Sequence, residues 1–218
     1  MAKVLVGIYG ASGFGREVLP LVRAQLKVVD AELVFVDDGD VGPSMNGYKV
    51  LSYEQFLADD APGKQVVLAI ANSVVREELA QKCAGDNIPA LTVEADNTVV
   101  LDEVSVGEGA IFCHFTQLTS NIRIGKYFHA NIYSYVAHDC VIGDYVTLAP
   151  AVRCNGNVVI EDHAYIGTGA VIKQGSPDKP LVIGKGAIVG MGAVVTKDVP
   201  PGVTVVGNPA KIFEPRKA

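Results

Sequence analysis

The fold of this chain is decided by residues 136–172, which read VAHDCVIGDYVTLAPAVRCNGNVVIEDHAYIGTGAVI. Every sixth residue of this stretch is apolar, and the same phase extends back to residue 100. In a chain that is 49% hydrophobic, thirteen apolar residues at steps of six arise by chance on the order of once in ten thousand sequences. The series is Val100, Val106, Phe112, Leu118, Ile124, Ala130, Val136, Ile142, Leu148, Cys154, Ile160, Ile166 and Ile172.

A second set of inward positions lies two residues earlier in most repeats, for example at Val146, Val152 and Val158. Two inward positions in six residues predict a short strand followed by a tight turn. Gly107, Gly125 and Gly143 recur every 18 residues, and we expect them at turns that need a positive φ. Eighteen residues per coil predict a three-sided prism of parallel strands, a β-helix.

The repeat is interrupted once, at residues 173–181, where one glycine and two prolines indicate a loop. The apolar phase resumes at Ile183, Val189 and Val195. We therefore expect the β-helix to continue beyond this loop towards the end of the chain.

The first half of the chain has a different pattern, in which apolar strand-like segments alternate with segments of helical periodicity. Ser52 is a good N-cap for a short helix. This order predicts a small parallel α/β domain, Rossmann-like in its opening strand, glycine turn and helix. The expected strands are 4–9, 33–36 and 66–70, and the expected helices are 18–26, 53–58 and 74–83.

Composition excludes several classes of protein. Lys and Arg number 18 against 24 Asp and Glu, for a net charge of −6, and no basic run is present, so nucleic acid is not an expected partner. No apolar run is long enough to span a membrane and no signal peptide is recognisable, so we expect a cytoplasmic protein. The four cysteines form no CxxC pair and are expected to be reduced core thiols.

The glycine turn of the first half has the order Gly10-x-x-Gly13-x-Gly15. This differs from the G-x-G-x-x-G fingerprint, which disfavours a nicotinamide-dependent dehydrogenase. Backbone N–H groups at a helix N-terminus can still bind a phosphate, and Asp37 and Asp38, after the next strand, could accept hydrogen bonds from a sugar or a base. A tight turn and a solvated strand end would account for the same residues.

His138 is the candidate for acid–base chemistry among the four histidines. It lies two residues after the inward Val136, which places it at a turn, and Asp139 follows it directly. Imidazole has a pKa near working pH and can accept the proton of an attacking amine or hydroxyl. A neighbouring carboxylate can fix its tautomer and raise its basicity.

Four motifs together resemble a known family, and they span nearly the whole chain: Tyr9–Gly15, Val36–Asp38, Ala137–Asp144 and Val206–Lys211. They are similar to hexapeptide-repeat nucleotide-sugar N-acetyltransferases of the bacillosamine, perosamine and viosamine types, and to sialic acid O-acetyltransferases. The resemblance implies a left-handed β-helix, a homotrimer, and acetyl-CoA bound between adjacent subunits. It also implies that residues 1–98 bind the nucleotide-linked amino sugar, whereas residues 99–218 bind acetyl-CoA and carry the catalytic site, with no metal.

The resemblance assigns roles to individual positions. His138 corresponds to the general base and Asp139 to the acid that orients it. Many members have His where this chain has Phe14, and some have His at the position of Thr147 and Gly at the position of Met191. The implied sugar-binding residues are Ser12, Gly13, Phe14, Asp37, Asp38, Ala71 and Asn72, and the implied acetyl-CoA-binding residues are Thr147, Gly156, Thr168, Gly190 and Met191.

Several alternatives stay open at this point. Base catalysis serves a hydroxyl as well as an amine, so O-acetylation of a sugar or of sialic acid is a second hypothesis. A trimeric scaffold that binds a nucleotide sugar without reacting it is a third. A γ-type carbonic anhydrase is disfavoured, because the histidine spacings lack the close pair that its zinc needs. The sequence leaves the nucleotide (UDP, GDP or dTDP), the sugar and the pathway undetermined.

Overall fold

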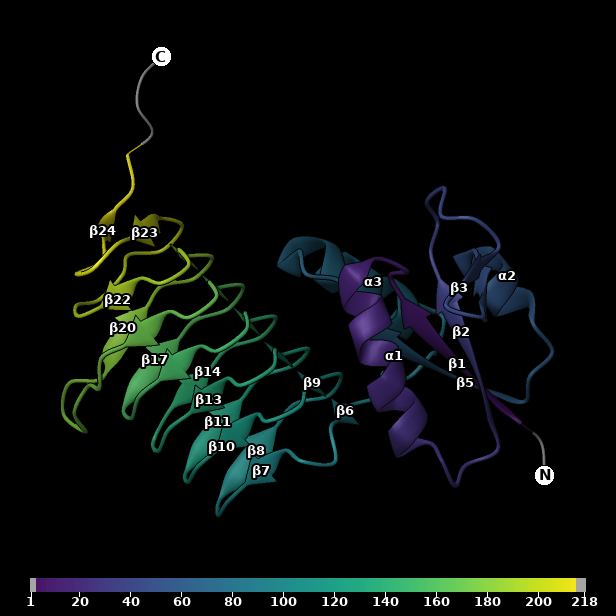
Figure 1. Cartoon of the computed structure of the whole chain (residues 1–218), viewed down its shortest axis with the longest axis horizontal. Helices are drawn as coiled ribbons and strands as arrows, with labels where there is room; N and C mark the ends of the chain where they lie inside the picture. Colours follow the sequence, from purple (N-terminus) through teal and green to yellow (C-terminus); the bar gives the residue numbers. More distant parts are fainter. Residues whose placement is uncertain (1–2, 215–218) are drawn as a thin grey trace. The chain divides into compact units, whose positions relative to one another are not determined.

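The computed structural model describes residues 3–214 and divides the chain into two compact units, residues 1–96 and 97–218 (Figure 1). The first unit contains a five-stranded sheet in the order β3-β4-β2-β1-β5. All pairs are parallel except the β3–β4 hairpin at one edge. Its elements are β1 (Val4–Tyr9), α1 (Gly13–Gln25), β2 (Ala31–Val36), β3 (Ser44–Met45), β4 (Tyr48–Leu51), α2 (Tyr53–Ala58), β5 (Gly63–Leu68), α3 (Ser73–Gly85) and β6 (Val93–Glu94).

Local sequence explains these elements. The apolar strand β1 is central, and its residues from Leu5 onward are buried. Ser52 caps α2 through a capping box, in which its hydroxyl accepts from the Gln55 N–H while the Gln55 side chain accepts from the Ser52 N–H. The predicted α/β fold of this half is confirmed. The β3–β4 hairpin is not among the strands expected from the sequence.

The second unit is the predicted parallel β-helix, whose short strands stack as rungs in three sheets (Figure 1). One sheet holds β7 (Val99–Val100), β10 (Gln117–Leu118), β13 (Tyr135–Val136), β16 (Arg153–Cys154), β19 (Val171–Ile172) and β22 (Val194–Val195). A second holds β8 (Val104–Val106), β11 (Ile122–Ile124), β14 (Val141–Ile142), β17 (Val158–Ile160) and β20 (Leu181–Ile183). A third holds β9 (Ile111–Phe112), β12 (His129–Ala130), β15 (Thr147–Leu148), β18 (Tyr165–Ile166), β21 (Ile188–Val189), β23 (Thr204–Val206) and the antiparallel β24 (Lys211–Ile212).

The three edges of the prism are formed by turns with positive φ, one per coil. We name them after one member. The His138 edge has its positive φ at Glu103, Asn121, Asp139 and Asn157. The Tyr145 edge has it at Gly109, Tyr127, Tyr145, His163, Gly186 and Gly202. The Gly169 edge has it at Phe115, Tyr133, Ala151, Gly169 and Gly192.

The structure corrects the role expected of the glycines at 107, 125 and 143. None of the three has a positive φ; the positive φ falls two residues later, mostly on residues other than glycine. A Cβ on Gly107 would lie 2.7 Å from the backbone of Gly125, and one on Gly143 would lie 2.6 Å from the Asp162 nitrogen. These glycines are therefore required by the close stacking of successive coils.

The inward positions form one continuous core, but the first two members of the apolar series do not belong to it. Val100 and Val106 are 42% and 39% exposed. They lie on β7 and β8, the terminal strands of their sheets, so no further rung of those sheets covers one side of them. From Phe112 to Ile172 every member is buried, as are the four cysteines, which are free thiols.

This difference predicts different mutational effects at two valines of the same sheet and the same phase. Val136→Ala is expected to lower the free energy of unfolding by about 2–3 kcal/mol, because it removes fully buried methyl groups and leaves a cavity. Val100→Ala, the matched control, is expected to cost less than about 1 kcal/mol. Urea denaturation of both variants measures this, and equal losses would contradict the assignment of the core.

Candidate functional site

His138 and Asp139 form one turn at the His138 edge. Val136 and Cys140, on either side of the turn, are completely buried and fix it to the core. Asp139 has a φ of 58°, a conformation that Asp adopts more readily than most residues. The core thus anchors the turn while both of its side chains remain about half exposed.

The Nδ1 atom of His138 lies 2.7 Å from Oδ2 of Asp139. A carboxylate only accepts hydrogen bonds, so Nδ1 carries the proton and donates it. In the neutral imidazole the lone pair is then on Nε2. The pair therefore has a fixed tautomer in its neutral form, and it lies at the surface of this unit.

Gly156 lies directly above the imidazole, as the step of eighteen residues predicts. A Cβ at Gly156 would lie 2.5 Å from Cε1 and 2.6 Å from Nε2 of His138. Only a glycine leaves room for the ring in this position. Asn157 N–H donates to the His138 carbonyl at 2.9 Å, whereas the Gly156 N–H has no hydrogen-bond partner among residues 3–214.

Two further side chains support this turn, and the sequence analysis missed both. The Tyr135 hydroxyl donates to Oδ1 of Asn155 at 2.7 Å. The amide nitrogen of Asn155 donates to the Ile172 carbonyl, also at 2.7 Å. These bonds hold the residue before Gly156 between two coils. The 18-residue register could have indicated this contact. It pairs Tyr135 with Arg153, so that Asn155 lies only two residues beyond the partner of Tyr135.

The glycine turn of the first unit is built for close approach. Gly10 has a φ of 105°, and a Cβ on Gly15 would collide with the Gly10 carbonyl oxygen. Gly13 has open space around it, and Ser12 is the N-cap of α1 without a side-chain cap bond. The N-terminus of α1 is thus bordered by small, exposed residues, with the partly buried Phe14 beside them.

Asp37 fixes this turn. Its Oδ2 accepts from the Ala11 N–H at 2.8 Å and its Oδ1 accepts from the Gly39 N–H at 2.9 Å. Both oxygens are therefore already engaged with backbone, and each keeps one further lone pair. The carboxylate was predicted as a ligand-binding group; the structure also makes it the clamp of the glycine turn.

Asp38 is held by a separate network. Burial alone would raise the pKa of its carboxyl, but the Tyr53 backbone N–H, the Tyr9 hydroxyl and Lys82 together hold the pKa below its usual value. Burial and the hydrogen bond to Asp38 raise the pKa of Tyr9. Lys82 lies 4.1 Å above the Tyr53 ring. Asp38 is thus ionised and fixed at the wall of a cavity.

That cavity has a volume of about 610 Å³ and lies at the carboxyl end of the central strands. The turns after β1, β2 and β5 meet at this edge, because the three strands are parallel neighbours. Ala71 and Asn72 follow β5, and Asn72 caps α3 by accepting from the N–H groups of Val74 and Val75. The predicted sugar-binding residues are therefore gathered at one edge of the sheet. The cavity itself is lined by Asp37, Asp38, Gly39, Asp40, Val41, Gly42, Val50, Leu51, Ser52, Tyr53, Glu54 and Lys82.

The predicted acetyl-CoA-binding residues are not gathered within one chain. Gly156 lies on the His138 edge, whereas Thr168, Gly190 and Met191 lie at or beside the Gly169 edge, where the Gly192 N–H donates to the Thr168 carbonyl. Met191 is 81% exposed. Thr147 lies on β15 and is buried. Apart from Thr147, which lies buried on a strand, the predicted set is thus divided between two edges of the prism.

Two absences concern the described part of the chain. Between residues 3 and 214, no group of three or more His, Cys, Asp or Glu side chains is arranged to hold a metal ion. None of the helices in that range has the length and apolar character needed to cross a bilayer.

Comparisons with known proteins cover both units. A family model described as the PglD N-terminal domain matches residues 6–83. The chain is 52% identical over 210 residues to GDP-perosamine N-acetyltransferase of Escherichia coli O157:H7, with 95% of each protein covered. The solved structure of WeeI from Acinetobacter baumannii AYE superposes with a TM-score of 0.94 at 65% identity, covering 97% of this chain and 100% of that one. The acetyltransferase domain of PglB from Neisseria gonorrhoeae FA1090, in complex with acetyl coenzyme A, superposes with a TM-score of 0.86 at 27% identity, again over 97% of this chain and 100% of that one.

Proposed function

Since this chain belongs to the family of hexapeptide-repeat nucleotide-sugar acetyltransferases, we propose that it acetylates the 4-amino group of a nucleotide-linked 4-amino-4,6-dideoxy sugar. The predicted family and its left-handed β-helix are confirmed, and the chain is an acetyltransferase that uses acetyl-CoA. The hypothesis of a scaffold without activity is wrong. The observation that carries the proposal is the His138–Asp139 turn with Gly156 stacked on the imidazole, the N–H of Gly156 having no hydrogen-bond partner among residues 3–214.

In the proposed reaction, Nε2 of His138 accepts a proton from the sugar amine as the nitrogen attacks the thioester carbonyl. Asp139 keeps the proton of the neutral ring on Nδ1 and stabilises the imidazolium that forms. The Gly156 N–H is the candidate donor to the developing oxyanion. When the tetrahedral intermediate collapses, the carbon–sulfur bond breaks and the imidazolium returns its proton to the CoA thiolate.

The first test is activity with a panel of amino sugars. GDP-, UDP- and dTDP-linked 4-amino-4,6-dideoxy sugars are mixed with acetyl-CoA, and the release of free thiol is followed. A GDP-linked sugar is the first candidate, because the E. coli relative is named for GDP-perosamine. Treatment of the product with hydroxylamine separates an amide from an ester. An ester product would replace the proposal with the O-acetylation hypothesis, and thiol release with none of these sugars would overturn it.

We place the nucleotide sugar at the edge of the α/β sheet, on the residues gathered around the glycine turn. Asp37→Ala is expected to raise the KM for the nucleotide sugar by a factor corresponding to about 1–3 kcal/mol, because it removes a charged acceptor and loosens the Ala11 N–H. The KM for acetyl-CoA is expected to stay unchanged.

Asp40→Ala is the matched control for this prediction. Asp40 lines the same cavity and, among residues 3–214, its carboxylate has no hydrogen-bond or ion-pair partner. Both variants are compared by steady-state kinetics after circular dichroism has shown that they fold. If Asp37→Ala raised the KM for acetyl-CoA instead, the α/β unit would not be the sugar-binding unit.

We further propose that the active form is a homotrimer. Gly156 lies on the His138 edge, whereas the other predicted acetyl-CoA residues except Thr147 lie at or beside the Gly169 edge. A ligand that runs along one edge can contact both groups only where the His138 edge of one copy meets the Gly169 edge of another. The Gly169 edge also exposes Ile132, Tyr133 and Phe115, each at least 42% exposed, which a neighbouring copy would cover.

The expected mass in solution is therefore about three times the 22.9 kDa of one chain. Multi-angle light scattering of the purified protein measures it. A stable monomer at micromolar concentration that retained full activity would remove the shared site from the proposal.

A further inference from the structure

The β-helix carries one insertion, at the His138 edge. Up to this point successive coils pair at steps of 18 residues, as in Arg153 with Val171. The next pairs, such as Ile160 with Ile183 and Ile172 with Val195, are 23 residues apart, five more. The core continues in register on both sides. The fold does not need these extra residues, and in repeat proteins such insertions often carry the binding function.

The insertion borders a cavity of about 700 Å³, which we call the lysine cavity. Lys173, Lys179 and Lys197 line it together with the hydroxyl-bearing Ser176 and Thr196. The three lysines are exposed, and none of their ammonium groups has an ion-pair or hydrogen-bond partner within residues 3–214. Other lysines of the β-helix, such as Lys126 and Lys185, are paired with carboxylates.

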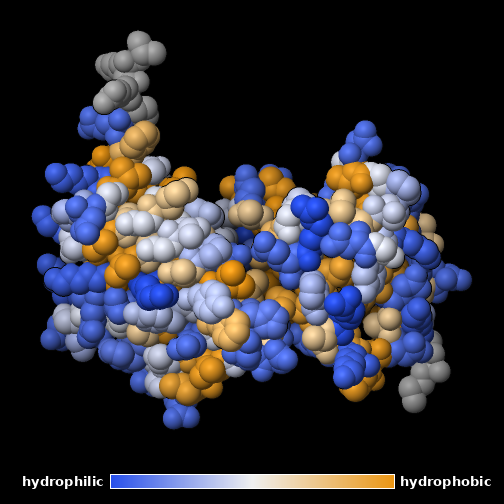
Figure 2. Space-filling view, viewed as in Figure 1, coloured by the Kyte–Doolittle hydropathy of each residue, from blue (hydrophilic) through white to orange (hydrophobic). Residues whose placement is uncertain are grey.

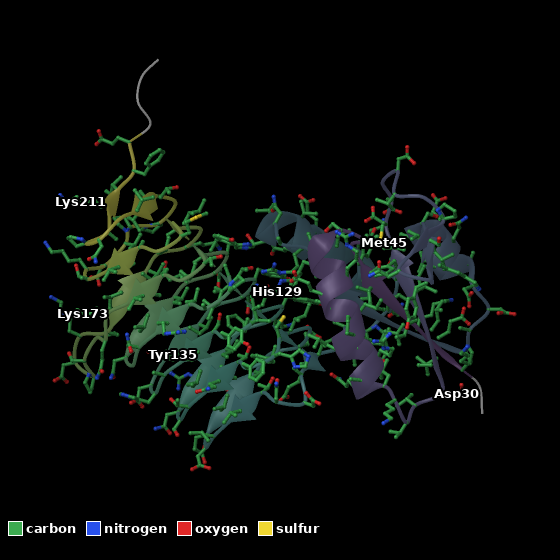
Figure 3. All side chains as sticks on the ribbon, in the orientation of Figure 1. Asp30, Met45, His129, Tyr135, Lys173 and Lys211 are labelled. Atoms are coloured by element: carbon green, nitrogen blue, oxygen red, sulfur yellow. The ribbon has the colours of Figure 1, made fainter. Side chains whose placement is uncertain are left out.

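The cavity is therefore a site of net positive charge, with three lysines against one carboxylate, on a chain whose net charge is −6. One carboxylate lines it, that of Asp198, and its Oδ1 accepts from the Val182 N–H at 3.0 Å. Figure 3 labels Lys173 on the left side of the β-helix, where Figure 2 shows mostly hydrophilic residues. Lysine is an effective partner for phosphate, which it binds as a compact point charge.

The lysine cavity lies on the same edge as His138. The Asn157 N–H donates to the His138 carbonyl, and the Gly175 N–H donates to the Gly156 carbonyl at 3.0 Å. Gly175 is thus two rungs above the His138 turn. At about 4.8 Å per rung, two to three rungs place the cavity about 10–14 Å along the edge from the base.

We propose that the lysine cavity binds the phosphate groups of acetyl-CoA, an inference that rests on the proposed acetyl-transfer function. Acetyl-CoA has its thioester at one end and a diphosphate and a 3′-phosphate at the other, joined by the long pantetheine arm. With the thioester at Nε2 of His138 and the Gly156 N–H, an arm extended along this edge delivers the phosphates to the three lysines. The predicted acetyl-CoA residues contain none of these lysines.

The test is the triple variant Lys173→Gln, Lys179→Gln, Lys197→Gln of the full chain, titrated with CoA by isothermal calorimetry. The dissociation constant for CoA is expected to rise about 10- to 100-fold, because several charge-assisted contacts are lost. Lys185→Gln is the matched control: it removes an exposed lysine that Asp162 already pairs, and CoA binding is expected to stay within about twofold of wild type.

Dephospho-CoA identifies the phosphate that the lysines contact. If the 3′-phosphate lies in the cavity, the wild type prefers CoA over dephospho-CoA and the triple variant loses that preference. If the diphosphate lies there, both ligands weaken equally in the triple variant. Either result supports the proposal.

Unchanged CoA binding in a folded triple variant would overturn it, as would a raised KM for the nucleotide sugar with an unchanged KM for acetyl-CoA. The titrations contain no sugar, so they are independent of whether any amino sugar is acetylated. A failure of the proposed function would appear in the activity panel alone.

Discussion

His138→Ala is expected to lower kcat by about 10²- to 10⁴-fold, the range that general-base catalysis contributes. The dissociation constant for acetyl-CoA is expected to change little, because the imidazole contacts the thioester only as the reaction proceeds. The variant should fold, since the His138 side chain is about half exposed and its turn is held by the buried Val136 and Cys140. Steady-state kinetics and calorimetry with acetyl-CoA measure the two effects.

Asp139→Asn separates the base from its orientation. The carboxamide can offer its NH₂ group to Nδ1, which permits the wrong tautomer, but it leaves the imidazole in place. A smaller loss of kcat than for His138→Ala is therefore expected. If His138→Ala retained turnover close to that of the wild type, the base would be another group, and the proposed chemistry of the turn would be wrong.

Gly156→Ala is expected to lower kcat by about 10²-fold, because a displacement of about 1 Å at a reacting group can cost that much. The added Cβ would lie 2.6 Å from Nε2 of His138. The exposed imidazole can swing away from it, so the free energy of unfolding should change by less than about 1 kcal/mol. We therefore expect a large loss of kcat with almost no change in the free energy of unfolding, and steady-state kinetics and urea denaturation measure the two.

Gly143→Ala is the contrasting control on another edge of the prism. Its Cβ would meet the backbone nitrogen of Asp162 at 2.6 Å, and a coil backbone cannot move aside as a side chain can. This variant should lose stability. In the double variant His138→Ala, Gly156→Ala the second substitution should have almost no further effect on kcat, because both act through the imidazole. Additive losses would show that Gly156 acts independently of His138.

Much of the architecture could be predicted because a hexapeptide repeat leaves a direct record in the sequence. The inward series from Phe112 to Ile172 is buried as expected, and the spacing alone places Gly156 over His138. The roles of Gly107, Gly125 and Gly143 could not be read in this way. A positive φ and a lack of space for a Cβ both select glycine, and only the three-dimensional structure distinguishes them.

Some contacts of the candidate sites could be predicted from the sequence and others could not. The adjacent pair His138 and Asp139 is visible because its two members are neighbours in the chain. The hydrogen bond from the Ala11 N–H to the Asp37 carboxylate joins residues 26 positions apart. It could not be predicted, because nearly every residue has a backbone N–H and the residue type does not show which one is bound. The contact between Tyr135 and Asn155 depends on side-chain lengths across two coils, which periodicity does not specify.

The constant register of the coils has a consequence for how such a protein can change. Groups on one edge are separated by whole rungs, so the distance between them along the edge is always a multiple of the rung spacing. The distance between two such groups cannot be adjusted gradually by point substitution; it changes when a complete coil is added or removed. A loop at an edge, by contrast, can lengthen without changing the spacing of the rungs. The pairs Ile160–Ile183 and Ile172–Val195 demonstrate this, because they still form across the insertion. The distance between two groups on an edge and the residues that an edge loop presents can therefore change independently in this fold.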